Sequence, residues 1–266
     1  MTRDKAAYCG DRAHLAAYAK AVEENFRKKW ATAALSALRA FLLSLVIASA
    51  SCRREQRESG SPAPSPAAVF EPAVLKGENA LEQVRRFTAL GPRDSGTPGA
   101  ARAAAYIADN LRNSGIAIEI DEFQDDTPAG RMTFRNVLGR IKGSGRGMMV
   151  LGAHYDTKSG IAEGFSGAND SGSGVGLLLE MASVLGRGPH PPMEIVFAFF
   201  DGEECIRQYS PRDGLHGSRR MADRLRATEE SRLVAAVMVV DMIGDKDPVF
   251  KLPENSHPGL CAAIFS

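Results

Sequence analysis

Apolar residues gather in three short, nearly uninterrupted runs in the second half of the chain. These runs are Met148–His154, Glu194–Phe200 and Leu233–Asp241. Short apolar runs of this kind predict strands that are covered on both faces. Further upstream, apolar and polar positions alternate in Ile116–Phe123, and Met132–Ile141 is rich in residues that favour strands. Both segments therefore predict two more strands.

Segments with a helical pattern separate or precede these strands. Ala100–Ser114 contains strong helix formers, and Gly115 stands where glycine commonly ends a helix. The pattern also predicts helices over Glu78–Leu90, Gly172–Leu185 and Gly217–Arg226. Strands that alternate with helices are typical of an α/β fold. We therefore expect a three-layer sandwich with a mostly parallel central sheet flanked by helices.

Residues 1–52 have the pattern of a targeting segment. Arg27, Lys28 and Lys29 precede an apolar stretch that is uninterrupted only over Ala40–Ala50. This stretch is too short for a spanning helix, which needs about 20 apolar residues. A charged region, a short apolar region and small residues are typical of a secretory signal. The small residues lead to Cys52 in a sequence that resembles a bacterial lipobox, in which the cysteine is lipidated.

Two interpretations of Cys52 stay open, a lipid anchor and an incidental cysteine after a plain signal peptide. Residues 53–69 are polar and rich in proline, and they predict a disordered tether. The pattern from residue 70 onward predicts a folded domain over residues 70–266. We expect a bacterial protein that is exported, either to the periplasm or to a membrane surface as a lipoprotein.

The charge changes along the chain. The formal net charge is +1, but residues 1–69 hold 11 Lys and Arg against 6 Asp and Glu, and the remainder holds 22 against 26. A mildly acidic body disfavours a surface that binds nucleic acid. The four cysteines are scattered, so no disulfide framework is expected. We therefore expect no nucleic-acid partner, and membrane contact only through a lipid anchor at Cys52.

Acidic or imidazole side chains stand at the end of each apolar run or just after it: His154, Asp156, Glu203, Glu204 and Asp241. One more, Asp170, precedes a predicted helix. Ligands of open α/β sheets bind at the carboxyl ends of the strands, so these side chains are expected to meet at one edge. Imidazole and carboxylate groups without thiolates suit a catalytic zinc ion. Neighbouring side chains on a strand point to opposite faces, so Glu203 and Glu204 act together only if the chain turns at Gly202.

Five motifs occur in a fixed order around these residues: AHYDTK, GANDSGSG, FFDGEE, SPRDGLHGSR and VVDMIGDKDPVF. This order resembles the zinc exopeptidase family of aminopeptidases and glutaminyl-peptide cyclotransferases, from about residue 78 to the end of the chain. The resemblance implies a zinc exopeptidase fold and a peptide or protein N-terminus as the substrate.

The resemblance to the two-zinc aminopeptidases implies one set of roles. His154 and Asp241 would bind one metal, Glu204 would bind the other, and Asp170 would bridge the two. Asp156 would orient His154, as carboxylates commonly do behind a metal-bound imidazole.

The resemblance to the cyclases implies a second set of roles. A single zinc would be held by Asp170, Glu204 and a later histidine. His154 would then be structural, and Asp241 would assist catalysis. In both sets, Glu203 is the general base that carries the proton.

The segment after the Glu pair favours the cyclase alternative. CIRQYSPRDGLHGSRRMA is longer than the corresponding stretch of aminopeptidases and resembles WSPxDSLYGSRHLA of the cyclases, with Tyr209 in place of Trp and His216 in place of Tyr. We therefore expect a cyclotransferase that forms pyroglutamate with release of ammonia. A metal-dependent aminopeptidase and an inactive fragment that keeps the fold remain alternatives. Because the last histidine ligand of the family lies in a further segment, the domain is expected to be C-terminally truncated.

Overall fold

The computed structural model describes residues 75–246 and 256–265. The targeting segment and tether predicted over residues 1–52 and 53–69 lie outside the described residues. Residues 75–246 form an α/β body, and helix α6 (Pro258–Phe265) belongs to a separate part of the chain. Within the described ranges, no helix combines the length and apolar character needed to cross a membrane.

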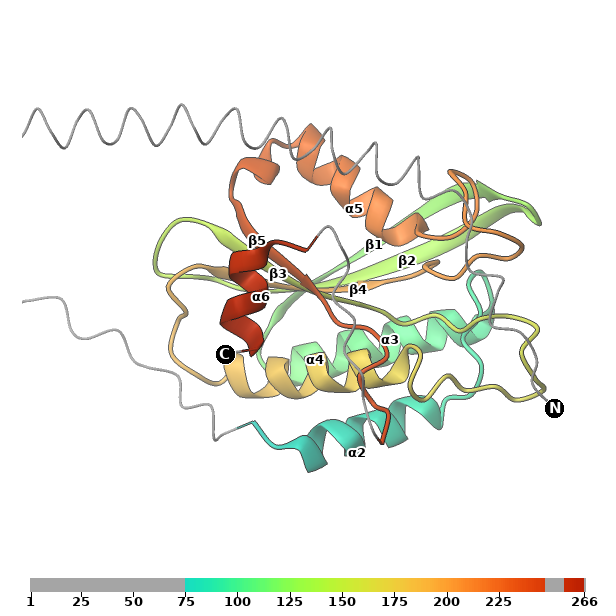
Figure 1. Ribbon diagram of the computed structural model, residues 1–266, viewed down its shortest axis with the longest axis horizontal. Helices are drawn as coiled ribbons and strands as arrows, with labels where there is room; N and C mark the ends of the chain where they lie inside the picture. The colour runs from blue at the N-terminus through green and yellow to red at the C-terminus, as the bar shows by residue number, and fades with distance from the viewer. Residues whose placement is uncertain (1–74, 247–255, 266) are drawn as a thin grey trace, which may run out of the picture. The chain divides into compact units, whose positions relative to one another are not determined.

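Helices cover both faces of a central sheet in the body (Figure 1). Helices α3 and α4 pack against one face, α2 packs on the outside of α4, and α5 covers the other face. In chain order the elements are α2 (Gly77–Thr88), α3 (Pro98–Asn113), β1 (Ala117–Thr127), β2 (Gly130–Ile141), β3 (Met148–His154), α4 (Gly172–Leu185), β4 (Glu194–Phe200), α5 (His216–Ala227), a 3₁₀ turn (Glu230–Arg232) and β5 (Val234–Val239). The predicted α/β fold with flanking helices is therefore confirmed.

The sheet is mixed, so the prediction of a mostly parallel sheet holds only for the strands β4, β3 and β5. Its five strands lie in the order β1-β2-β4-β3-β5. Strand β3 runs parallel to β4 and to β5, whereas β2 is antiparallel to both β1 and β4. The reason is the connection between β1 and β2, in which Thr127 pairs with Gly130 and no helix intervenes. So short a connection can join only antiparallel strands.

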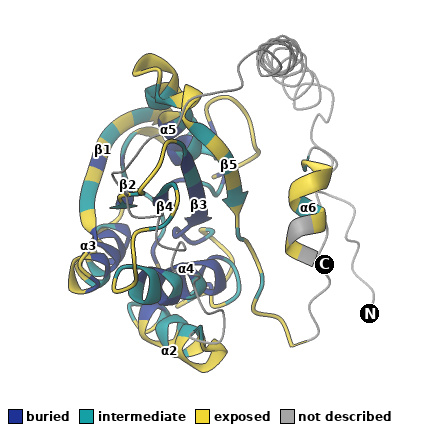
Figure 2. Cartoon of the chain, turned by 90° about the vertical axis from the view of Figure 1, so that its left-hand side faces the viewer, coloured by how far each residue is buried: buried dark blue, intermediate teal, exposed yellow. Residues whose placement is uncertain are grey.

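Burial separates the central strands from the edge strand β5 (Figure 2). On β4, Phe197 and Phe199 enter the core beneath α3 and α4, while Val196 packs on the α5 side. Strand β5 alternates instead, and Val237 and Val239 are 53% and 62% exposed. The prediction that both faces are covered is therefore right for β3 and β4 and wrong for β5, whose outward residues are exposed. Within the described body, β5 is also the last strand of the sheet, with a neighbouring strand on one side only.

Candidate active site

The candidate residues lie together at one edge of the sheet. His154 is the last residue of β3, Glu203 and Glu204 follow β4, and Asp241 follows β5. Because β3 is parallel to both neighbours, the carboxyl ends of these three strands meet at the same edge (Figure 1). Asp170 comes to this edge from the loop before α4.

Three of these side chains form a group that could hold a metal ion. The ligand atoms of His154, Asp170 and Asp241 all lie within 4.8 Å of one another. His154 Nε2 is 2.9 Å from an oxygen of Asp170 and 3.5 Å from an oxygen of Asp241. Despite these short distances, the buried Nε2 makes no hydrogen bond of acceptable geometry. A buried imidazole nitrogen without a hydrogen bond, facing two carboxylates, fits a site for a divalent cation.

The surroundings of His154 favour a positive charge at this position. The side chain is 4% exposed, and its Nδ1 lies 3.3 Å from the carboxylate of Asp156. Burial alone would lower the pKa of His154, but the nearby carboxylates of Asp156, Asp170 and Asp241 raise the pKa to about 12. A proton or a metal cation can supply the charge that these three carboxylates stabilise. The site is suited to either one, and a metal ion bound at Nε2 would take the place of the proton.

The turn after β4 carries the Glu pair, and it is held from two sides. The chain turns at Gly202, where φ is +68°. The segment that opens α5 donates three backbone N–H groups to this turn: Leu215 to Glu203 O, His216 to Gly202 O and Gly217 to Asp201 O, at 2.8–2.9 Å. On the other side, the carboxylate of Asp156 accepts the N–H groups of Glu203 and Glu204 at 3.2 and 3.1 Å. Asp156 therefore ties the turn to His154.

Glu203 and Glu204 differ in their surroundings. Burial raises the pKa of Glu203 to about 7, and the charges of Asp156 and Glu204 act in the same direction. Burial also raises the pKa of Glu204, followed by the charge of Asp170. The carboxylate of Glu204 lies 3.6 Å from the Lys158 ammonium and is not a member of the close three-residue group. A carboxyl group with a pKa near 7 suits proton transfer near neutral pH.

Two residues near the site were not predicted as important. Asp201 is fully buried and accepts hydrogen bonds from the Ser95 hydroxyl at 2.8 Å and from the Arg135 N–H at 2.9 Å. Arg93 is also fully buried, and it donates to the carbonyl oxygens of Tyr155 at 2.8 Å and Ser166 at 2.6 Å. Arg93 thus fastens the loop that leads to Asp170.

A cavity of about 250 Å³ borders the same turn. Glu204 and Asp156 line it on one side, and Phe134 lines it on another. His216 also lines it; the imidazole stacks on Phe134 and its Nδ1 lies 2.7 Å from Asp125. A small molecule in this cavity would therefore touch the candidate site.

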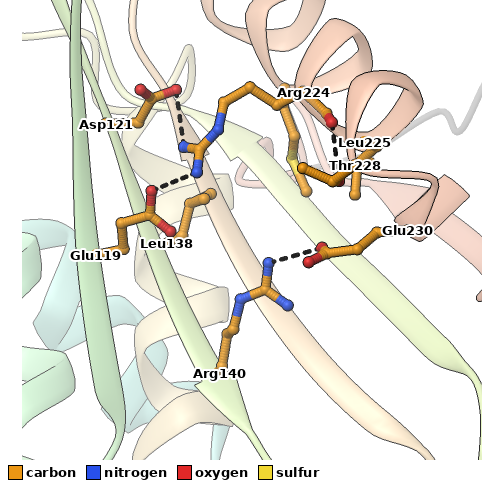
Figure 3. A pocket seen from close by; sticks show the side chains of 9 residues that line it. Glu119, Asp121, Leu138, Arg140, Arg224, Leu225, Thr228 and Glu230 are labelled. Atoms are coloured by element: carbon orange, nitrogen blue, oxygen red, sulfur yellow. Dashed lines mark hydrogen bonds and ion pairs between the residues drawn. The ribbon is translucent and has the colours of Figure 1, made fainter.

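A second pocket lies between α5 and the first two strands (Figure 3). Arg224 pairs there with Glu119 at 2.6 Å and Asp121 at 3.1 Å, and Arg140 pairs with Glu230 at 3.2 Å. The charged groups of this pocket are therefore already paired with one another. Arg140 stands opposite the beginning of β4, away from the carboxyl ends of the parallel strands. The strand ends remain the better candidate site.

Comparison with known proteins identifies the family. Residues 136–262 match the sequence profile of peptidase family M28. The solved structure of a glutaminyl cyclase from an Acidobacteriales bacterium is 35% identical, with a TM-score of 0.67, over 77% of this chain and 70% of that chain. The chain belongs to peptidase family M28. The predicted relationship to zinc exopeptidases and glutaminyl cyclases is thereby confirmed.

Other similar proteins bear the names of glutaminyl-peptide cyclotransferases or of a zinc-dependent exopeptidase. A glutaminyl-peptide cyclotransferase of Drosophila melanogaster is 28% identical over 195 residues, which cover 70% of this chain and 55% of the relative. A glutaminyl-peptide cyclotransferase-like protein of Bos taurus is 32% identical, over 59% of this chain and 45% of the relative. A Zn-dependent exopeptidase of Parabacteroides distasonis has a TM-score of 0.55 at 26% identity, over 65% of this chain and 63% of that chain. This M28 chain spans about half the length of the curated relatives it matches.

Proposed function

We propose that the protein is a zinc-dependent glutaminyl-peptide cyclotransferase, which converts an N-terminal glutamine into a pyroglutamyl residue and releases ammonia. The observation that carries the proposal is the position of Glu203. Its carboxyl group has a pKa near 7, and its backbone N–H bonds the same Asp156 carboxylate that faces His154 of the His154–Asp170–Asp241 group. The similarity to glutaminyl cyclases supports the reaction type.

Asp170 would hold the zinc ion in both sets of roles that we consider. In the one-zinc set, Glu204 and a later histidine would complete the ligands, His154 would be structural and Asp241 would assist catalysis. In the two-zinc set, His154 and Asp241 would join Asp170 on one metal. A bound zinc would polarise the carbonyl group under attack.

Glu203 would move the proton in the proposed reaction. The substrate amine attacks its own γ-carboxamide carbon, so that a C–N bond forms and closes the lactam ring. Glu203 takes a proton from the attacking nitrogen and gives it to the departing nitrogen, which leaves as ammonia when its C–N bond breaks. Asp156 would hold Glu203 in reach through the backbone N–H that it accepts.

One observation favours a metal-dependent aminopeptidase as a second candidate. The close group of His154, Asp170 and Asp241 corresponds to one metal of the two-zinc set. In that reaction Glu203 would take its proton from water, and the leaving group would be the shortened peptide. A third alternative is a chain that keeps the fold and lacks activity.

Mass spectrometry of peptide products tests the proposal. The zinc-loaded, full-length protein is incubated with matched peptides that begin with Gln, Leu or Ala. We expect the Gln peptide to lose the mass of ammonia faster than free Leu or Ala is released. Rapid release of free Leu without a pyroglutamyl product would make the protein an aminopeptidase, and no product from any peptide would support the inactive alternative.

We also propose that a bacterium exports the protein, either to the periplasm or to a membrane surface through a lipid anchor at Cys52. The basis is the targeting pattern of residues 1–52, which lies outside the described residues. Metabolic labelling with a fatty-acid probe tests the anchor. Label that persists in Cys52→Ser would contradict it, and an unlabelled periplasmic protein would favour a plain signal peptide.

A further inference from the structure

The loop between Glu204 and α5 is a closed unit with its own internal bonds. The carboxylate of Asp213 accepts the backbone N–H groups of Ile206, Arg207 and Gln208 at 2.5, 2.8 and 2.9 Å. Ser210 and Asp213 exchange two backbone hydrogen bonds, at 2.9 and 3.1 Å. Asp213 is 2% exposed, so water does not compete for these bonds. The loop therefore holds the residues between its two ends in a fixed position.

Tyr209 lies inside this closed loop and reaches the Glu pair. Its hydroxyl oxygen is 3.2 and 3.3 Å from the two carboxylate oxygens of Glu203, and 3.5 Å from one oxygen of Glu204. The ring itself is also held. The ring packs so tightly on Gly214 that a Cβ atom added to Gly214 would lie 2.6 Å from a ring carbon. The Lys158 ammonium lies 5.9 Å from the ring centroid.

We propose that Tyr209 is a positioning residue for Glu203, and that its hydroxyl donates a hydrogen bond that holds the carboxylate toward the reacting nitrogen. This inference rests on the proposed role of Glu203 as proton carrier. A phenol has one hydrogen to donate, whereas an ionised carboxylate accepts at both oxygens. The hydroxyl is within reach of both oxygens of Glu203 and can bond only one at a time, so the carboxylate keeps lone pairs that can accept the substrate proton. A hydrogen bond to a charged group also restricts the side chain to one rotamer.

Tyr209→Phe tests the proposal because it removes the hydroxyl and keeps the ring on Gly214. We expect kcat for Gln-peptide cyclisation to fall about tenfold, which corresponds to the free energy that one hydrogen bond to a charged group contributes. KM and zinc content should stay unchanged, because the hydroxyl lies nearer to both oxygens of Glu203 than to the zinc-ligand candidate Glu204. A role in packing alone would leave kcat unchanged. A kcat of Tyr209→Phe within twofold of the wild type would overturn the proposal.

Tyr106→Phe is the matched control. The hydroxyl of Tyr106 also donates to a side chain, Gln83, at 3.3 Å, but it lies between α2 and α3. This variant loses the same atom without any contact to the Glu pair. We expect its kcat to equal that of the wild type. An equal fall in both variants would show that loss of any such hydroxyl disturbs the protein, and would overturn the specific role of Tyr209.

A spectroscopic readout separates this inference from the proposed function. The chain has five tyrosines, so ¹³Cζ labelling gives a small set of resonances, and Tyr209→Phe identifies one by its loss. We expect this resonance to shift in Glu203→Gln, because an amide oxygen is a weaker acceptor than a carboxylate. An unmoved resonance would overturn the contact. A wild type that forms no product would instead refute the proposed function, and the resonance would still decide whether Tyr209 binds Glu203.

Discussion

Asp156 offers the sharpest test of how the candidate site is held together. Its side chain is 1% exposed. One carboxylate oxygen faces His154 Nδ1 at 3.3 Å and the Glu203 N–H at 3.2 Å. The other faces the Glu204 N–H at 3.1 Å and the Ser95 hydroxyl at 3.3 Å. Asp156→Asn keeps the shape of the side chain, but replaces one of these accepting oxygens by an N–H donor.

The cost of Asp156→Asn follows from which oxygen is replaced. The Ser95 hydroxyl already donates to Asp201 at 2.8 Å, so it loses little when the second oxygen becomes an amide nitrogen. The Glu204 N–H then faces a donor and loses its bond, which costs about 1.5–3 kcal/mol for a bond to a charged acceptor. Loss of the negative charge also weakens the two remaining bonds. We expect the free energy of unfolding to fall by about 2–4 kcal/mol in total.

Urea denaturation of the wild type and Asp156→Asn at pH 7 measures this difference. Asp126→Asn is the control, since this carboxylate is exposed on the β1–β2 hairpin, and its effect should stay within about 0.5 kcal/mol. Burial opposes the charge of Asp156, but the bonds from His154, Glu204 and Glu203 keep its pKa below the usual value. The stabilisation is therefore present above the unfolded pKa and disappears as the pH falls through the folded pKa. A loss below about 1 kcal/mol at pH 7 would refute the reasoning.

Four further predictions concern the chemistry of the site. Glu203→Gln should keep the zinc and lower kcat by about 10²–10⁴-fold, because the amide cannot carry a proton; turnover close to that of the wild type would exclude Glu203 as the base. Asp170→Ala should lose zinc, as measured by elemental analysis, because Asp170 is a ligand in both sets of roles. His154→Ala should lose one metal in the two-zinc set and none in the one-zinc set, and zinc retained in Asp170→Ala would contradict both sets. Finally, kcat/KM should rise with pH through about 7, because Glu203 accepts a proton only when ionised and burial raises its pKa to about 7; a profile that is flat between pH 5 and 9, roughly two units on either side, would contradict this.

The central elements of the fold could be predicted because their sequence signal is strong. Strands β3 and β4 and helix α4 begin and end where the apolar runs predicted. The pairing of β2 with β4 could not be predicted from periodicity, because strand order depends on contacts between distant segments. The hairpin between β1 and β2 did leave a signal, in the short Thr127–Gly130 connection between two strand-like segments.

The sequence predicted which residues make up the candidate site, but it did not predict all the residues that hold them in place. His154, Asp170 and Asp241 stand at strand ends or before a helix, where polar residues are conspicuous beside apolar runs. Arg93 gave no signal, because arginine is usually exposed and its carbonyl partners Tyr155 and Ser166 lie far along the chain, between β3 and α4. The contact between Tyr209 and Glu203 depends on the closed loop, which no local pattern reveals.

The closed loop between Glu204 and α5 has a consequence for how such proteins diversify. Backbone bonds from Leu215 and His216 to the turn fix its exit, and the carboxylate of Asp213 organises its interior. Neither the core beneath the sheet nor the strand pairing includes residues of this loop. The loop is therefore a module that can be exchanged as a unit, because the entropy of closing a surface loop changes little with its length. Natural or designed exchange of this module would alter what surrounds Glu203 while the strands that present it stay unchanged.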